Sequence, residues 1–159
     1  MKKTNIRMAW HDYQALLYEE QDLKTTVSQA QKIPYSPRFL HTTLYADKFD
    51  PALLATCRLG LLSARSVMNT GGRPAVEAMD FMKRIEPTSE SMSHNFLIDH
   101  IEQHLQNYNP DSYAQTIAST EEISTLAQFN QRNAAILQLD EFEILNRNLD
   151  FLTKARKQL

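Results

Sequence analysis

The chain has 159 residues, 42% of them hydrophobic and 23% charged, which is typical of a folded globular protein and not of a disordered one. Seventeen basic and nineteen acidic residues give a formal charge of −2, so no broad positive field is available to attract nucleic acid or anionic lipid. Three glycines are too few for the many tight turns of an all-β protein, and this favours helices.

Cysteine content and hydropathy predict a cytoplasmic protein. The one cysteine, Cys57, excludes an internal disulfide framework and favours a reducing compartment. The first three residues resemble the start of a signal peptide, but polar residues follow where its apolar core would lie. The most apolar stretch, residues 51–68, is interrupted by Arg58 and Arg65, so we expect no membrane-spanning segment.

The first predicted element is a long helix over residues 4–32, which Pro34 ends because its ring blocks continuation. At 1.5 Å per residue it would run roughly 43 Å, so we expect it to be the spine of a bundle or to project from it. Its heptad repeat predicts a left-handed crossing with other helices and marks it as the surface for a homo-oligomer. The apolar heptad positions are Ala9, Tyr13, Leu16, Leu23, Val27 and Ala30.

Residues 33–50 interrupt the helical pattern with prolines and aromatic residues. Within them, residues 39–45 fit either a short helix or a strand, and Ser36 before Pro37 favours the helix. The next predicted helix, over residues 51–69, begins at Asp50-Pro51 and is apolar on nearly all sides, which predicts the central, most buried helix. Gly71 and Gly72 end it.

Four helices and one short turn are predicted after the glycine pair. Helices are expected over residues 74–85 and 91–108, followed by a short turn at residues 110–118. The pairs Ser119–Glu122 and Asp140–Glu143 match capping boxes, so the C-terminal region is divided into two helices near residues 138–140. The chain is thus predicted to be one all-α domain over residues 1–159, a bundle of about five to seven helices with a long N-terminal helix.

His100 and His104 are the best metal-site candidates. They lie at i and i+4 on one helix face and could form half of a site, whereas His94 lies roughly 15 Å from His104 along the axis, too far to share one zinc ion. The simpler interpretation is a pair of surface histidines, and we predict no cofactor.

Other chemical patterns are weaker. Cys57 lies among leucines in mid-helix, which suits a buried small hydrophobe better than a nucleophile. Gly71, Gly72 and Arg73 precede a helix and could hold a phosphate, but a glycine cap and a turn explain the same residues. The same segment read as a helix-turn-helix would present Glu77 and Asp80 to DNA phosphates, so nucleic acid is not the expected partner.

The aromatic segment of residues 33–50 has the composition of a protein-binding surface. The simpler interpretation, which we favour, is that it folds across one end of the bundle. Among functional interpretations we adopt a non-enzymatic protein-interaction module, such as an adaptor, inhibitor, chaperone or regulatory subunit, whose partner is another protein. The alternatives are a dimeric nucleic-acid-associated regulator and a metal- or small-ligand-binding protein using His100 and His104. The predicted partner-binding residues are Tyr35, Arg38, Phe39, His41, Tyr45 and Phe49.

Overall fold

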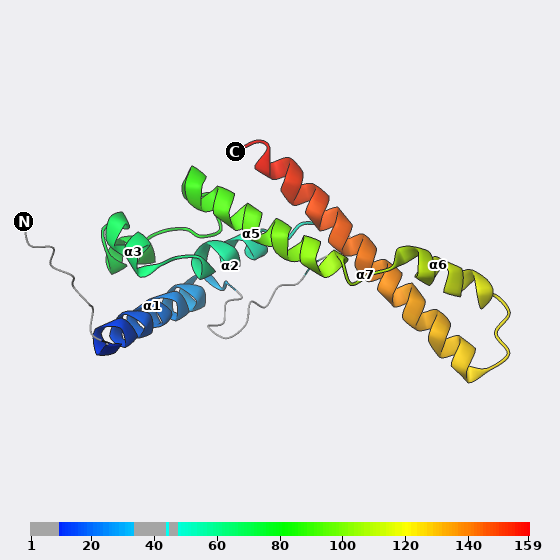
Figure 1. Cartoon of the computed structure of the whole chain (residues 1–159). Helices are drawn as coiled ribbons and strands as arrows, with labels where there is room; N and C mark the ends of the chain where they lie inside the picture. Colours follow the sequence, from blue (N-terminus) through cyan, green and yellow to red (C-terminus); the bar gives the residue numbers. More distant parts are fainter. Residues whose placement is uncertain (1–9, 34–43, 45–47) are drawn as a thin grey trace, which may run out of the picture. The chain divides into compact units, whose positions relative to one another are not determined.

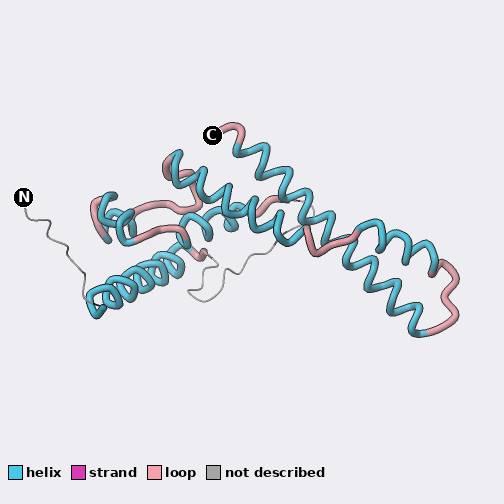
Figure 2. Tube along the Cα trace, viewed as in Figure 1, coloured by secondary structure: helices cyan, strands magenta, loops and turns pink. Residues whose placement is uncertain are grey.

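A computed structural model describes residues 10–33, 44 and 48–159, and within them the protein is all-helical, with no strand (Figures 1 and 2). The all-α prediction is therefore confirmed, and the helix number lies at the top of the predicted range. The seven helices of the described residues are α1 (Trp10–Gln31), α2 (Pro51–Gly60), α3 (Ala64–Thr70), α4 (Arg73–Glu77), α5 (Pro87–Leu105), α6 (Pro110–Ser119) and α7 (Leu126–Arg156).

The chain divides into two compact units. Unit 1 comprises residues 1–42 and 51–89, and unit 2 comprises residues 43–50 and 90–159. The single domain over residues 1–159 stays a prediction. None of the helices in residues 10–33 and 48–159 combines the length and apolar composition that crossing a bilayer requires.

The longest described helix is C-terminal, not N-terminal as the heptad pattern predicted. Helix α7 has 31 residues and α1 has 22, and residues 4–9 of the predicted N-terminal helix lie outside the described part of the chain. Helix α1 ends close to the predicted position, where Lys32 takes a positive φ of 54° and Ile33 donates its N–H to the carbonyl of Ser28 at 2.9 Å.

The predicted helix over residues 51–69 is two helices. Helix α2 is as buried as its apolar sequence indicated, with residues 53–59 all shielded from solvent, but it ends at Gly60. Ser63 then caps α3, its Oγ accepting the N–H of Ser66 at 3.2 Å. Gly71 ends α3 at a φ of 107° and donates its N–H to Met68, the left-handed geometry that glycine adopts without strain.

Helix α4 is only five residues long, whereas residues 74–85 were predicted to be helical. Asp80 gives a physical reason, because its side chain accepts the N–H of Met82 at 3.1 Å and so offers the backbone a turn in place of a helix. The segment after α4 is tied back to unit 1 by Gln31, whose side chain donates to the carbonyl of Met79 and accepts the N–H of Phe81.

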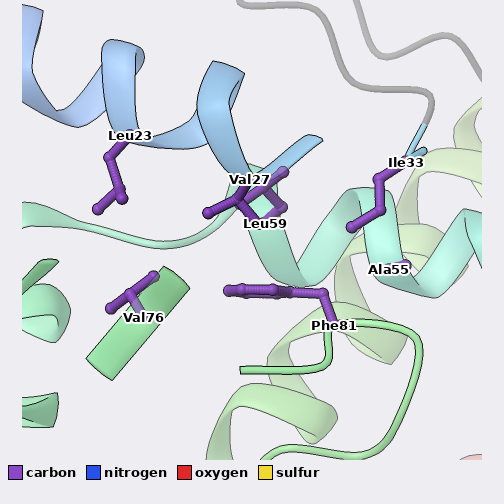
Figure 3. Packing of buried hydrophobic residues seen from close by; sticks show 7 residues of the cluster. All are labelled: Leu23, Val27, Ile33, Ala55, Leu59, Val76 and Phe81. Carbon is purple, nitrogen blue, oxygen red and sulfur yellow. The ribbon is translucent and has the colours of Figure 1, made fainter. Parts of the chain in front are cut away.

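The core of unit 1 gathers side chains from α1, α2, α4 and the segment after α4 (Figure 3). Two buried cations in this unit hold backbone carbonyls: Lys24 Nζ donates to Gly60 at 3.0 Å, and Arg58 Nη1 donates to Phe81 at 2.8 Å. The heptad residues Leu23 and Val27 are buried as predicted. The buried core residues are Leu23, Val27, Ile33, Ala55, Leu59, Val76 and Phe81.

The helices from residue 87 onwards depart from the predicted boundaries because of their first residues and caps. Helix α5 begins at Pro87, a residue suited to a first helical position, and residues 110–119 form helix α6 instead of a turn, capped by Asn109 accepting from Ser112. The predicted boxes at Ser119 and Asp140 do not start helices. The observed box is Thr125–Gln128, and α7 continues through residues 138–140 without a break.

Helix α7 is the element on which unit 2 is assembled. Near its C-terminal end Arg156 donates to Asn95 of α5 at 3.0 Å, and Phe142 and Glu141 in mid-helix contact the ring and hydroxyl of Tyr108, just after α5. Helix α6 packs beside the N-terminal half (Figure 1). The contacts with α5 and with Tyr108 therefore fall on the C-terminal half of α7, and the contacts with α6 fall on its N-terminal half.

Candidate protein-binding surface

The predicted partner-binding residues fall mostly outside the described residues. This holds for Tyr35, Arg38, Phe39, His41 and Tyr45. The sixth, Phe49, is half-buried and stacks on Phe151 of α7, with ring centroids 4.3 Å apart and planes inclined by 14°. This stack uses the Phe49 ring inside unit 2, so the described structure offers the predicted surface no free aromatic ring at this position.

His100 and His104 lie on an exposed face of α5. Their rings meet edge to face with centroids 4.9 Å apart, and Phe96 stacks on His100 at 6.1 Å. Among the residues that the structure describes, no group of three or more His, Cys, Asp and Glu side chains is placed to hold a metal ion. Phe96, His100 and His104 form a row of neighbouring, contacting rings along this face of α5.

The remaining sequence candidates are occupied by structural contacts. Cys57 is buried, and desolvation raises the pKa of its thiol to about 12 although Arg58 opposes the rise, so the reactive thiolate is disfavoured. Arg73, considered for phosphate binding, pairs with Asp22 and with Glu77 at 2.7 Å each. Its guanidinium links α4 to α1.

The surface that sequence reasoning missed lies on the N-terminal half of α7. Leu126 is 75% exposed, Leu137 63% and Phe129 46%. At 100° per residue these three positions fall within an arc of about 80° on one side of the helix. Large apolar side chains on neighbouring turns of one face differ from the scattered apolar residues normal on a protein surface.

Three further exposed residues complete this face. Asn130, Asn133 and Ala134 lie between the large apolar side chains, and together the six span an arc of about 140°. We name the set the α7 stripe: Leu126, Phe129, Asn130, Asn133, Ala134 and Leu137.

The opposite side of α7 is covered by α6. Ala135, about 180° around the helix from Leu126, is buried. Arg132 lies on the α6 side as well, and its Nη1 donates to the carbonyl oxygens of Ile117 at 2.8 Å and Thr120 at 3.0 Å. These carbonyls are the unsatisfied groups at the C-terminal end of α6, where a cation also complements the helix dipole.

The charges of α7 are unevenly distributed. From Leu126 to Leu139 the one charged residue is Arg132, which is engaged with α6, whereas all the other charged residues of the helix lie from Asp140 onwards. Depletion of charge together with exposed leucine and phenylalanine is the composition of a protein interface core, not of an ordinary solvated helix face.

The start of the stripe is fixed by the Thr125–Gln128 capping box. Thr125 Oγ1 accepts the N–H of Gln128 at 3.2 Å, and Gln128 Oε1 accepts the N–H of Thr125 at 3.2 Å. The spacing Thr-x-x-Gln is visible in the sequence and would have placed the helix start correctly. Which face of α7 stays exposed depends on where α6 packs, and no local pattern carries that information.

Comparison of the chain with protein-family models, curated proteins and solved structures finds no match.

Proposed function

We propose that this chain is a non-enzymatic protein-interaction module of the cytoplasm, which binds its partner through the α7 stripe. The observation that carries the proposal is the exposure of Leu126, Phe129 and Leu137 on a helix face without charge, opposite the face that packs on α6. Burying such side chains against a partner removes apolar area from water, which stabilises a complex by roughly 25 cal/mol per Å² before the costs of association.

The packing of α7 also supports the proposal. Binding sites need a face held in place by a rigid scaffold, so that little conformational entropy is lost on association. The N-cap box at Thr125 and the Arg132 contacts with α6 hold the stripe on a regular helix. A partner with an apolar groove or helix face fits this shape.

Affinity capture with matched variants tests the proposal. The stripe variant carries Leu126→Gln with Leu137→Gln, and the control carries Tyr18→Gln with Met68→Gln, two side chains of unit 1 that are 74% and 72% exposed. Glutamine suits helices, so both variants are expected to fold, which circular dichroism checks. The baits are incubated with cell extract and with untagged copies of the same chain.

The expected result is that one or more proteins, or the untagged copy, bind wild type and control but bind the stripe variant at least about tenfold more weakly, the loss expected for two interface leucines. A bound set that is unchanged by the stripe substitutions would overturn the proposal.

A further inference from the structure

Two histidines of α5 lie outside the α7 stripe and are not used by the proposed function. His100 and His104 are one helical turn apart on an exposed face, and their ring centroids are 4.9 Å apart. Neither side chain takes part in a hydrogen bond or an ion pair within the part of the chain that the structure describes, so their nitrogens are open to a ligand. By contrast, His94 of the same helix is buried, and its Nδ1 lies 2.8 Å from the carbonyl oxygen of Glu90.

The separation of the two rings matches that of two imidazoles sharing one metal ion. An imidazole nitrogen binds a divalent transition metal at about 2.0–2.1 Å, which places the ring centroid about 3.2 Å from the ion. Two such rings at a ligand–metal–ligand angle of about 90° to about 109° have centroids about 4.5–5.2 Å apart. The observed 4.9 Å lies inside this interval. The two rings meet edge to face, and rotation about each exposed Cβ–Cγ bond turns one nitrogen of each ring towards a common point.

The charges around the histidine pair favour a bound cation. Residues 85–131 include no lysine or arginine and seven acidic residues. His104 also lies in the last turn of α5, where the helix dipole is negative. Arg156 reaches α5 at Asn95, which lies about 140° around the helix from His100 and so away from the pair. The seven acidic residues are Glu86, Glu90, Asp99, Glu102, Asp111, Glu121 and Glu122.

From this geometry and charge we propose that His100 and His104 form a binding site for one divalent transition-metal ion, with water in the remaining coordination positions. Imidazole is a good ligand for copper, nickel and zinc, and Cu²⁺ binds most tightly in this series. The second imidazole binds intramolecularly and adds at least about tenfold in affinity over a single histidine. We therefore expect a Kd on the order of 10 µM for Ni²⁺ and a lower Kd for Cu²⁺.

The nearest carboxylates contribute charge and not ligands. Asp99 and Glu102 lie about 100° and about 160° around the helix from His100, so they point away from the ion. This agrees with the finding that no group of three or more ligand side chains occurs among the described residues. Both carboxylates are within roughly 10 Å of the pair, the distance over which charges still act at moderate salt.

Calorimetric titration of the untagged protein with NiCl₂ tests the site. Wild type is expected to bind one Ni²⁺ per chain at the affinity given above. His104→Gln leaves a single imidazole, so its Kd is expected to be at least about tenfold higher. Position 104 is exposed and glutamine suits helices, so this variant is expected to fold, which circular dichroism checks.

The matched control keeps the number of histidines and changes their spacing. His104→Gln with Glu102→His places the two imidazoles about 160° apart around the helix, where they cannot reach one ion. The Kd of this spacing control is expected to equal that of His104→Gln. Glu102→Gln alone measures the effect of the lost charge and should keep the Kd within about threefold of wild type. A spacing control that binds as tightly as wild type, or a wild-type Kd above about 1 mM, overturns the proposal.

Nuclear magnetic resonance locates the bound ion independently. Substoichiometric Ni²⁺, which is paramagnetic, is expected to broaden the amide signals of residues 100–104 first in wild type and not in the spacing control. Because the chelate requires helical spacing, saturating Ni²⁺ should also slow hydrogen exchange in α5. Broadening centred on His11 or His41 would place the ion elsewhere and refute the site. The interaction module would still stand in that case, since the variants of the α7 stripe keep both histidines of α5.

Discussion

Arg58 donates a hydrogen bond from Nη1 to the backbone carbonyl oxygen of Phe81 across 2.8 Å, within the buried part of unit 1. A guanidinium that is 7% exposed is costly unless its donors are satisfied, so this contact has to be kept as long as the residue stays charged. It links α2 to the irregular segment after α4, which the side chain of Gln31 also ties to α1.

Arg58→Met is expected to destabilise the protein by about 2–3 kcal/mol, because methionine keeps much of the apolar stem but leaves the Phe81 carbonyl without this donor. Urea unfolding followed by circular dichroism measures the change. The control is Arg84→Met, at an exposed arginine, where the free energy of unfolding is expected to change by less than about 0.5 kcal/mol. Equal effects of the two substitutions would contradict a structural role for Arg58.

Arg132→Met is expected to loosen α6 from α7, because two carbonyls at the end of α6 lose their shared donor. The expected cost is about 1–3 kcal/mol, confined to this helical hairpin. Hydrogen exchange should therefore speed up in residues 110–119 and stay unchanged in α1. Arg147→Met is the matched control, since Arg147 is an exposed arginine of the same helix and lies beyond the α6 contact. Uniform faster exchange over the whole chain would argue against a local role.

Cys57 predicts a loss of stability at alkaline pH. Burial raises the pKa of its thiol from 9.0 to about 12, so the folded protein binds this proton more tightly than the unfolded chain. The stabilisation is fully present below pH 9 and is lost as the pH rises from 9 towards about 12. Wild type is therefore expected to lose more stability than Cys57→Ala between about pH 8 and about pH 11. Parallel curves for the two proteins would rule this out.

Thr125→Ala is expected to cost about 0.5–2 kcal/mol, because the N-terminal N–H groups of α7 lose a side-chain acceptor. Thr125→Ser keeps the hydroxyl and is expected to stay within about 0.5 kcal/mol of wild type. Thermal unfolding of both variants measures the difference. If serine and alanine were equally destabilising, the lost contact would be packing of the threonine methyl group and not the cap.

The parts of the fold that were predicted correctly depend on periodicity along one helix. Leu23 and Val27 recur at helical spacing and are buried, and the apolar sequence of α2 matches its burial. The break at Gly60 was missed because Leu61 and Leu62 continue the apolar pattern, while the new start depends on a serine cap that resembles many other serines.

The C-terminal region shows how a local motif can mislead. Asp140 and Glu143 have the spacing of a capping box, yet they lie in the middle of α7, where Glu143 faces Arg147 instead. Capping-box spacing recurs by chance in a charge-rich helix. It marks the start of a helix only where the backbone at the capping residue is itself non-helical. The α7 stripe was missed for a different reason: its exposure follows from tertiary packing of α6 on the other side of the helix.

The α6–α7 hairpin of unit 2 differs from unit 1 in how far apart along the chain its contacts lie. In unit 2 the contact between Arg132 and Ile117 spans 15 positions, whereas in unit 1 Gln31 reaches Phe81 across 50. Closing a short loop loses less chain entropy, and proteins rich in local contacts fold faster. The α6–α7 hairpin should consequently form early in folding, and it would present its uncharged face to other chains while unit 1 is still assembling.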